Sequence, residues 1–251
     1  MLNPHYLSQF NAGTNHNCAP LIVNKLFEFK ELKRGDIVLI PSKNSSRLAF
    51  GIIEDESIYT EVDQIHDVEF YKRRNIEWFA EYSTSKLDPV FFKMTHTHHV
   101  ISNIGSYDKY IDRIMYSVYK KNGFAHLSLE VGTEDDVDVE TLIGFVGALQ
   151  NLTISINEDF GFGENVSENS IRLNIQSPGI MEMKLLRGKS LMMLAVVLNI
   201  MACGNMDNIQ GTPAQKDRIQ EFVNSNDQIL DTVRHGVEEM KIDISRFNNI
   251  Y

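Results

Sequence analysis

The chain has 251 residues, 43% of them hydrophobic, which is enough for one large or two modest domains with a packed core. Its net charge of −10 argues against a protein that coats nucleic acid through bulk positive charge. Residues 1–125 carry 15 basic and 15 acidic residues, whereas residues 126–251 carry 9 and 19, so we expect basic patches only in the first part. The two cysteines form no CxxC pair and no apolar signal begins the chain, which favours a reducing, cytoplasmic compartment.

Residues 1–104 are expected to form a small curved β module. Its segments IVLI and LAFGII are rich in β-branched and aromatic residues and are separated by the turn-forming cluster PSKNSS, which predicts a β-hairpin. A tight turn at Gly35 and Asp36 should precede it. VEFYKRRNIEWFA is predicted to be a further strand, and VFFKMTHTHHVISNI to close the sheet. The segment LIVNKLFEF fits either a helix or a strand.

The order GDIVLIPSK, FGII and YKRRNIEWF resembles the small β-barrel of the EVE or PUA-like group and the N-terminal module of Mrr-type restriction proteins. In those families a hairpin and an aromatic-lined pocket bind a base or nucleotide, often a modified one. The resemblance therefore implies a ligand-binding site on the hairpin tip and the later strand. The residues at the matching positions are Ser42, Lys43, Arg47, Tyr71, Arg73, Arg74 and Trp78, and all of them except Ser42 are assigned to ligand binding.

The residue types on the later strand point independently to the same site. Arg73 and Arg74 supply guanidinium groups for phosphate, and Tyr71 and the single tryptophan, Trp78, supply rings for base stacking. The alternative is that the cations are solvated charges on an edge strand and that the tryptophan belongs to the core. The cluster HTHHV at 96–100 lacks further ligands at metal-binding spacing, so we expect no metal site there.

Residues 105–185 are expected to form an α/β domain. Ser106 is predicted to cap an amphipathic helix, YDKYIDRIMYSVYKKN, that ends before Gly123. FAHLSLEV predicts a strand, TEDDVDVETLIGFVGALQNL a helix, and TISIN and IRLNIQ two further strands. The polar face of the first helix carries the basic residues Lys109, Arg113, Lys120 and Lys121. These residues either contact an acidic partner or are solvated charges.

No catalytic motif stands out, since the chain lacks a GxSxG elbow, a P-loop, GxGxxG after a strand and HExxH. We therefore expect no catalytic residues and no cofactor. Glu182-Met-Lys184 has the Asp/Glu-x-Lys shape of a restriction-nuclease strand, and Glu164 or Glu168 would supply the upstream acid, so a metal-dependent nuclease is kept as an alternative. The acidic run at 134–136 does not match an EF-hand loop and suits a helix N-terminus.

Residues 186–206 contain the longest apolar run, from Ser190 to Gly204. Fifteen residues are fewer than the roughly 20 that span a bilayer, which favours a buried helix. Flanking cations and small or polar residues within the run favour instead a short oligomeric membrane helix, which is our expectation. The residues assigned to this membrane or oligomerisation surface are Leu191, Leu194, Val197, Leu198, Asn199 and Met201.

Residues 207–251 are expected to form a helical tail that begins at Thr212 and Pro213. The predicted fold class is thus α+β: a curved β module, an α/β layer, an apolar helix and a helical tail. The tail fits either an interface between subunits or a cover over its own domain.

The overall arrangement resembles the membrane effector of Hailong-type bacterial anti-phage systems. That resemblance implies a non-enzymatic defence effector that senses a nucleotide or short oligonucleotide made by a nucleotidyltransferase. It also implies a homo-oligomer attached to the lipid of the bacterial inner membrane through 190–203, acting as an ion channel. The alternatives are a soluble reader of nucleic acid such as modified DNA, and the nuclease.

Overall fold

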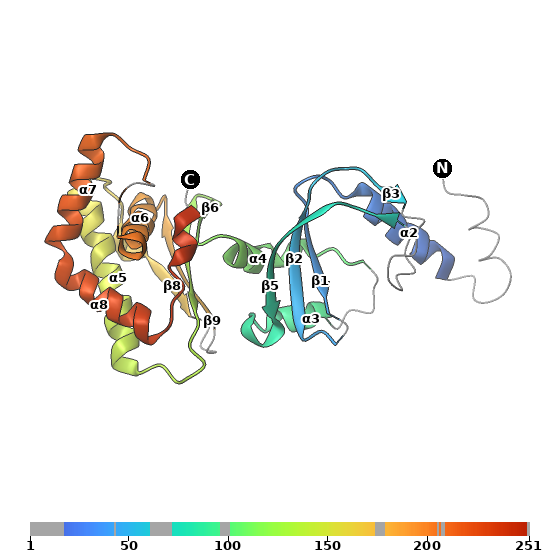
Figure 1. The fold of residues 1–251 in the computed structure, drawn as a ribbon, viewed down its shortest axis with the longest axis horizontal. Coiled ribbons are helices and arrows are strands. Elements are labelled where there is room, and N and C mark those ends of the chain that lie inside the picture. The colour runs from blue at the N-terminus through green and yellow to red at the C-terminus, as the bar shows by residue number, and fades with distance from the viewer. Residues whose placement is uncertain are drawn as a thin grey trace. The chain divides into compact units, whose positions relative to one another are not determined.

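The computed structural model describes residues 18–42, 44–60, 72–95, 101–173, 179–204, 206 and 209–249. The chain divides between Ile104 and Gly105 into two compact units, each with its own sheet and helices (Figure 1). Both units mix helices with antiparallel strands, so the predicted α+β class is confirmed.

The first unit is built on a three-stranded antiparallel sheet of order β1-β2-β5. The predicted hairpin is confirmed as β1 and β2, and Phe50 at its centre is fully buried between the rings of Tyr82 and Phe91. A small second sheet pairs β3 with β4. The elements are α2 (Cys18–Glu31), β1 (Ile37–Pro41), β2 (Arg47–Ile53), β3 (Tyr59–Thr60), β4 (Lys72–Arg73), β5 (Ile76–Ser83) and α3 (Val90–Thr95).

The prediction that VFFKMT belongs to a strand is wrong, because this segment is helix α3. The Asp88 carboxylate accepts a hydrogen bond from the backbone N–H of Val90 at 3.0 Å, and Pro89 stands between them. Aspartate followed by proline is a helix-start signal. The helix buries Phe91 against Phe50 of the sheet.

The second unit is a four-stranded antiparallel sheet of order β6-β7-β9-β8. Helices α5 to α8 lie on one side of this sheet, and the short helix α4 lies on the other (Figure 1). The elements are α4 (Asp108–Met115), β6 (Val118–Lys121), β7 (Phe124–Val131), α5 (Val139–Asp159), β8 (Ser170–Leu173), β9 (Gly179–Leu186), α6 (Lys189–Cys203), α7 (Pro213–Ser225) and α8 (Asp227–Glu239).

In the middle of the two central strands of this sheet, apolar and polar side chains alternate. The apolar side chains face the helices, are at most 2% exposed and form the sheet side of the core. They are Ala125, Leu127, Leu129, Met181, Met183 and Leu185. Successive side chains of a strand point to opposite faces, so His126, Ser128, Glu182 and Lys184 lie on the outer face beside α4. The sheet therefore carries a polar surface opposite its core.

The predicted helix over 107–122 is only half right, because α4 ends at Met115 and residues 118–121 form strand β6. Asn122 and Gly123 have φ of 51° and 81° and join β6 to β7. Asn-Gly is the preferred pair for a two-residue hairpin turn with positive φ at both positions. The hairpin signal KNGF thus ends the helix that the apolar spacing alone would extend.

The predicted strand TISIN is wrong, because α5 continues through it to Asp159. Leu149, Leu152, Thr153 and Ile156 are all buried and follow the helical spacing of i, i+3, i+4 and i+7. The Thr153 hydroxyl also donates to the Leu149 carbonyl at 2.7 Å. Packing of this stripe outweighs the weak preference of β-branched residues for strands.

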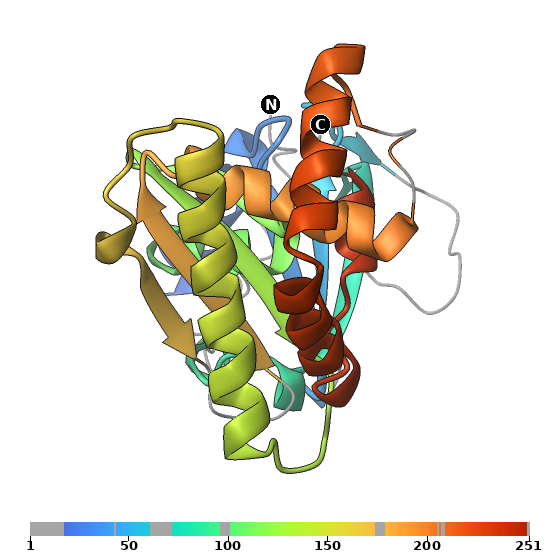
Figure 2. The same ribbon diagram turned by 90° about the vertical axis from the view of Figure 1, so that its left-hand side faces the viewer.

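The apolar run at 190–204 forms helix α6, which packs in the core of the second unit. Figure 2 shows α5 and α7 in front of it. Leu191, Leu194, Val197 and Leu198 are at most 1% exposed, and Asn199 donates to the Phe247 carbonyl at 2.6 Å. Met201 is half-buried. This packing favours the core-helix alternative over the expected membrane helix, because membrane insertion would require the core around these residues to open.

Among the described helices, α5 is the one that is long and apolar enough by length and composition to cross a membrane, with 33% of its most apolar window buried. The core helix of a globular domain passes the same test, so this is weak evidence for a membrane span. On its outward side Val139 and Ile143 are exposed.

The helical tail is confirmed, and it folds back over its own unit. Thr212 caps α7, and the side chain of Gln215 accepts in return from the Thr212 backbone, which completes a capping box beside Pro213. Phe222 and Leu230 join the same core cluster as α6. The tail therefore provides a cover over its own domain.

The N-terminus of α6 is capped by a carboxylate from a distant loop. Glu164 accepts from the backbone N–H groups of Lys189 and Ser190, at 2.7 and 2.9 Å, and from the Ser190 hydroxyl at 2.6 Å. Burial acts to raise the pKa of Glu164, but these hydrogen bonds outweigh it and leave the pKa lowered. Glu164 thus has a structural role at a helix end, where a negative charge is favourable.

Replacing Glu164 by alanine is expected to lower the free energy of unfolding by about 0.5–2 kcal/mol, as other lost caps do. Because the folded-state pKa is depressed, this stabilisation is present above the pKa of an unfolded glutamate and is lost as the pH falls below about 4.3. Denaturant titrations at neutral and acidic pH check this. Glu168→Ala, at an exposed position, is the matched control, and equal effects of the two variants at neutral pH would contradict the cap.

Candidate functional site

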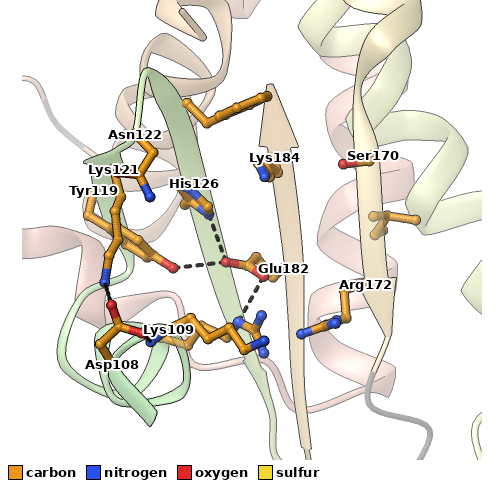
Figure 3. Close-up of a pocket in the computed structure, with 13 residues that line it drawn as sticks. Asp108, Lys109, Tyr119, Lys121, Asn122, His126, Ser170, Arg172, Glu182 and Lys184 are labelled. Carbon is orange, nitrogen blue, oxygen red and sulfur yellow. Dashed lines mark hydrogen bonds and ion pairs between the residues drawn. The ribbon is translucent and has the colours of Figure 1, made fainter. Parts of the chain in front are cut away.

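A pocket of about 520 Å³ lies on the outer face of the second unit's sheet, beside α4 (Figure 3). Its lining comes from α4, from all four strands and from the β6–β7 turn. Volumes of this size are typical of small-molecule sites.

The register of the strands sets the order of the polar side chains across this face. Directly paired residues of antiparallel strands lie side by side on the same face. Tyr119, His126, Lys184 and Ser170 are such successive partners and form one row from β6 to β8. In the next row Glu182 lies between Ser128 and Arg172. Segments far apart in sequence are thus brought to one surface.

Glu182 is the centre of a buried polar network. It is 6% exposed, and its Oε1 lies 2.8 Å from the Tyr119 hydroxyl and 2.8 Å from Nδ1 of His126 (Figure 3). The Tyr119 and His126 rings are stacked, with centroids 4.5 Å apart. Burial, and then the neighbouring Glu182 charge, raise the pKa of Tyr119, so its hydroxyl keeps its proton and donates to the carboxylate.

Arg113 of α4 supplies the positive charge that balances Glu182. Its Nε lies 2.8 Å from Oε2 of Glu182, yet the same Nε has no well-aligned hydrogen-bond acceptor. The contact is therefore an ion pair whose N–H is not directed at the carboxylate. Arg113 is 8% exposed, and the nearby Ser128 hydroxyl is also buried without a hydrogen-bond partner among the described protein atoms. Unsatisfied buried donors are uncommon and often mark functional sites.

The lining of the pocket has an excess of positive charge. It contains five basic residues, Lys109, Arg113, Lys121, Arg172 and Lys184, and two acidic residues, Asp108 and Glu182. The second unit as a whole has 13 basic and 21 acidic residues, so this concentration of cations opposes the charge of its domain. Three of the five, Lys109, Arg113 and Lys121, lie within residues 1–125, where the charge balance predicts basic patches, and Arg172 and Lys184 come from the acidic part of the chain.

Only some of these cations are neutralised inside the protein. Lys121 pairs with Asp108 at 2.7 Å and with Asp112, and its hydrogen bond is the main reason that the pKa of Asp108 is lowered. Within the described ranges, Lys109, Arg172 and Lys184 have no carboxylate within ion-pair distance. The Nζ of Lys184 lies 3.9 Å from the centre of the Phe124 ring. Three cations of the pocket thus lack a carboxylate partner in the part of the chain that the structure describes.

The six ligand-binding residues predicted from the resemblance lie in the first unit, and the structure does not gather them around a described pocket. Lys43 and Tyr71 lie outside the described residues. Arg47 pairs across the sheet with Glu81 at 2.6 Å, and both side chains are more than half exposed. Arg73 is half-buried on β4. Trp78 is 49% exposed and lies over Gly51, where a Cβ would come within 2.8 Å of its ring.

Arg74 has a structural role in the first unit. It is buried, and its guanidinium donates to the carbonyls of Phe29 at 3.0 Å and Lys30 at 2.6 Å. These carbonyls belong to the last turn of α2, where helices leave their acceptors unpaired. The position of Arg74 favours helix capping over contact with a ligand.

The residues considered for a nuclease do not assemble into a metal site. Glu182 and Lys184 share the pocket, but Glu164 caps α6 and Glu168 is exposed near Asn165. In the part of the chain that the structure describes, no group of three His, Cys, Asp or Glu side chains is arranged to hold a metal. The acidic residues at 134–136 are exposed, and the histidines at 96–100 lie outside the described residues.

Residues 7–103 match a family described as a domain of unknown function, DUF8426. Neither the curated proteins nor the solved structures contain a match to the chain. The matched residues fall within the first unit, and the pocket lies outside them. The expected resemblances to EVE or PUA-like modules and to Hailong-type effectors stay predictions.

Proposed function

We propose that the second unit binds a small phosphate-bearing anion, of the nucleotide class, in the pocket between α4 and the sheet. The observation that carries this proposal is the set of three cations, Lys109, Arg172 and Lys184, that have no carboxylate partner among the described residues and line a concave site of an acidic domain. Guanidinium and ammonium groups are the usual partners of phosphate oxygens, and Arg binds them in a bidentate way.

The buried network supports this function by fixing the floor of the pocket. Glu182 holds Arg113, Tyr119 and His126 in place, so the site is formed before a ligand arrives. Preorganised donors bind more tightly because less side-chain entropy is lost on binding. The proposal keeps the predicted anionic nucleotide ligand but moves its site from the first unit to the second.

A thermal-shift experiment with sodium pyrophosphate tests the proposal. We expect pyrophosphate to raise the melting temperature of the intact chain, since a ligand present at 100 times its Kd stabilises by about 2.7 kcal/mol. Lys184→Ala and Arg172→Ala should reduce the shift strongly. Lys120→Ala is the matched control, because Lys120 is an exposed lysine of β6 that does not line the pocket.

Sodium chloride at the same ionic strength separates binding from general screening. A shift that chloride reproduces, or that is equal in Lys184→Ala and Lys120→Ala, would show that the pocket is not the binding site. Loss of the shift in the pocket variants alone supports it.

Attachment to a membrane through 190–203, with channel activity and a role in anti-phage defence, is a separate proposal that rests on the sequence. It requires α6 to leave the core in which Leu194 and Leu198 are fully buried. Membrane fractionation of the intact chain, with and without pyrophosphate, tests it. Recovery in the membrane fraction only with the ligand would support a sensor that releases α6, and recovery in the supernatant under both conditions would count against it.

A further inference from the structure

We propose that the pocket also cleaves its ligand, as a metal-independent phosphodiesterase in which His126 is the general base. This inference rests on the proposed function, because the same cations must hold the phosphate. The key observation is that His126 contacts the buried carboxylate of Glu182 and lies in the cross-strand row that continues through Lys184 to Ser170 (Figure 3).

The hydrogen bonds around Glu182 determine which nitrogen of His126 is available. Glu182 is paired with Arg113 and is an acceptor when ionised, and its Oε1 receives the Tyr119 proton. Nδ1 of His126, 2.8 Å from the same oxygen, must then be the protonated nitrogen that donates to it. In the neutral ring Nε2 is therefore the basic nitrogen. A carboxylate that orients a histidine in this way stabilises the imidazolium formed when it accepts a proton.

The neighbouring cations suit a phosphodiester. Lys184 is the direct cross-strand partner of His126, and Arg172 is the partner of Glu182 one row away. Both lie within reach of a phosphate placed over the sheet beside His126. Cations directed at the phosphoryl oxygens stabilise the charge that builds up in the transition state.

The step is a hydrolysis. Water gives one proton to Nε2 of His126 while its oxygen attacks phosphorus. The bond between phosphorus and the leaving ester oxygen breaks, and this oxygen takes a proton from the Lys184 ammonium group. One phosphomonoester and one alcohol result. The His126 imidazolium then returns its proton through solvent to the Lys184 amine, which restores both groups.

His126→Asn tests the role of the free nitrogen. The asparagine amide places an N–H donor near the position of Nδ1 and has no group at the position of Nε2, so the contact with Glu182 is kept and the base is lost. With bis(p-nitrophenyl) phosphate as the substrate, we expect kcat of the intact chain to fall roughly 100-fold or more in this variant, the typical contribution of a general base.

Binding of pyrophosphate, measured by calorimetry on the same preparations, separates the two proposals. The inference is supported if the wild type and Lys120→Ala hydrolyse the substrate, whereas His126→Asn binds pyrophosphate but does not hydrolyse the substrate. Pyrophosphate binding with no hydrolysis, or with equal hydrolysis by wild type and His126→Asn, overturns the inference and leaves the proposed function standing. A chain that neither binds nor hydrolyses overturns both.

Discussion

Glu182→Leu is expected to lower the free energy of unfolding of the second unit by about 3–5 kcal/mol, because it leaves the Arg113 guanidinium buried without its counter-ion. Arg113 is 8% exposed, so water cannot replace the lost carboxylate without opening the contact between α4 and the sheet. The Tyr119 hydroxyl and Nδ1 of His126 lose their acceptor in the same variant.

Urea titrations followed by far-UV circular dichroism measure this effect. Fluorescence of the single tryptophan, Trp78, reports on the first unit and serves as an internal reference. The double variant Arg113→Met with Glu182→Leu should be more stable than Glu182→Leu alone, since it removes the uncompensated charge. A cost below about 1 kcal/mol for the single variant would mean that the ion pair is solvated and does not organise the pocket.

Leu198→Ala is expected to lower the free energy of unfolding by about 2–5 kcal/mol, the usual cost of truncating a fully buried leucine. Leu198 is 0% exposed at the centre of α6, within the cluster that joins the sheet to α5, α7 and α8. Ile143→Ala is the matched control, because Ile143 is 67% exposed on α5 and its truncation leaves no cavity. We expect its effect to stay within about 0.5 kcal/mol.

The same pair of variants separates the two interpretations of the apolar run. A core helix predicts a large effect of Leu198→Ala on unfolding in buffer. If α6 is instead a membrane helix that does not pack in the core, Leu198→Ala and Ile143→Ala should both have small effects on the free energy of unfolding. The second result would contradict the packing of α6 described above.

The sequence predicted those elements that are determined by residues close together in the chain. The β1–β2 hairpin follows from strand-forming runs around PSKNSS, and the start of α7 follows from Thr212 and Pro213. One error in secondary structure arose where a turn-forming pair of residues follows a segment with the apolar spacing of a helix. The apolar spacing within 107–122 fits a helix, but the hairpin turn at Asn122-Gly123 places residues 118–121 in strand β6.

The candidate site could be predicted only in part, because it is assembled by strand register. Glu182 and Lys184 attracted attention as an acid-x-lysine pair, and Lys109, Arg113 and Lys121 as the polar face of a helix. His126 gave no signal as a single histidine in a strand. Polar alternation in FAHLSLEV and GIMEMKLL does indicate one polar face for each strand, yet only the pairing of β7 with β9 places those faces together. The net charge of the second unit does not reveal the pocket either, because its cations are brought together only by the fold.

The most direct test of the central claim is isothermal titration calorimetry of sodium pyrophosphate into the intact chain and into Lys184→Glu. Loss of a charge-assisted hydrogen bond costs about 1.5–3 kcal/mol, so we expect the Kd to rise by roughly 10-fold or more in the variant. Lys120→Glu, which makes the same charge change outside the pocket, should bind as the wild type does. Equal affinities for all three proteins, or no binding by the wild type, would contradict a phosphate site on this face of the sheet.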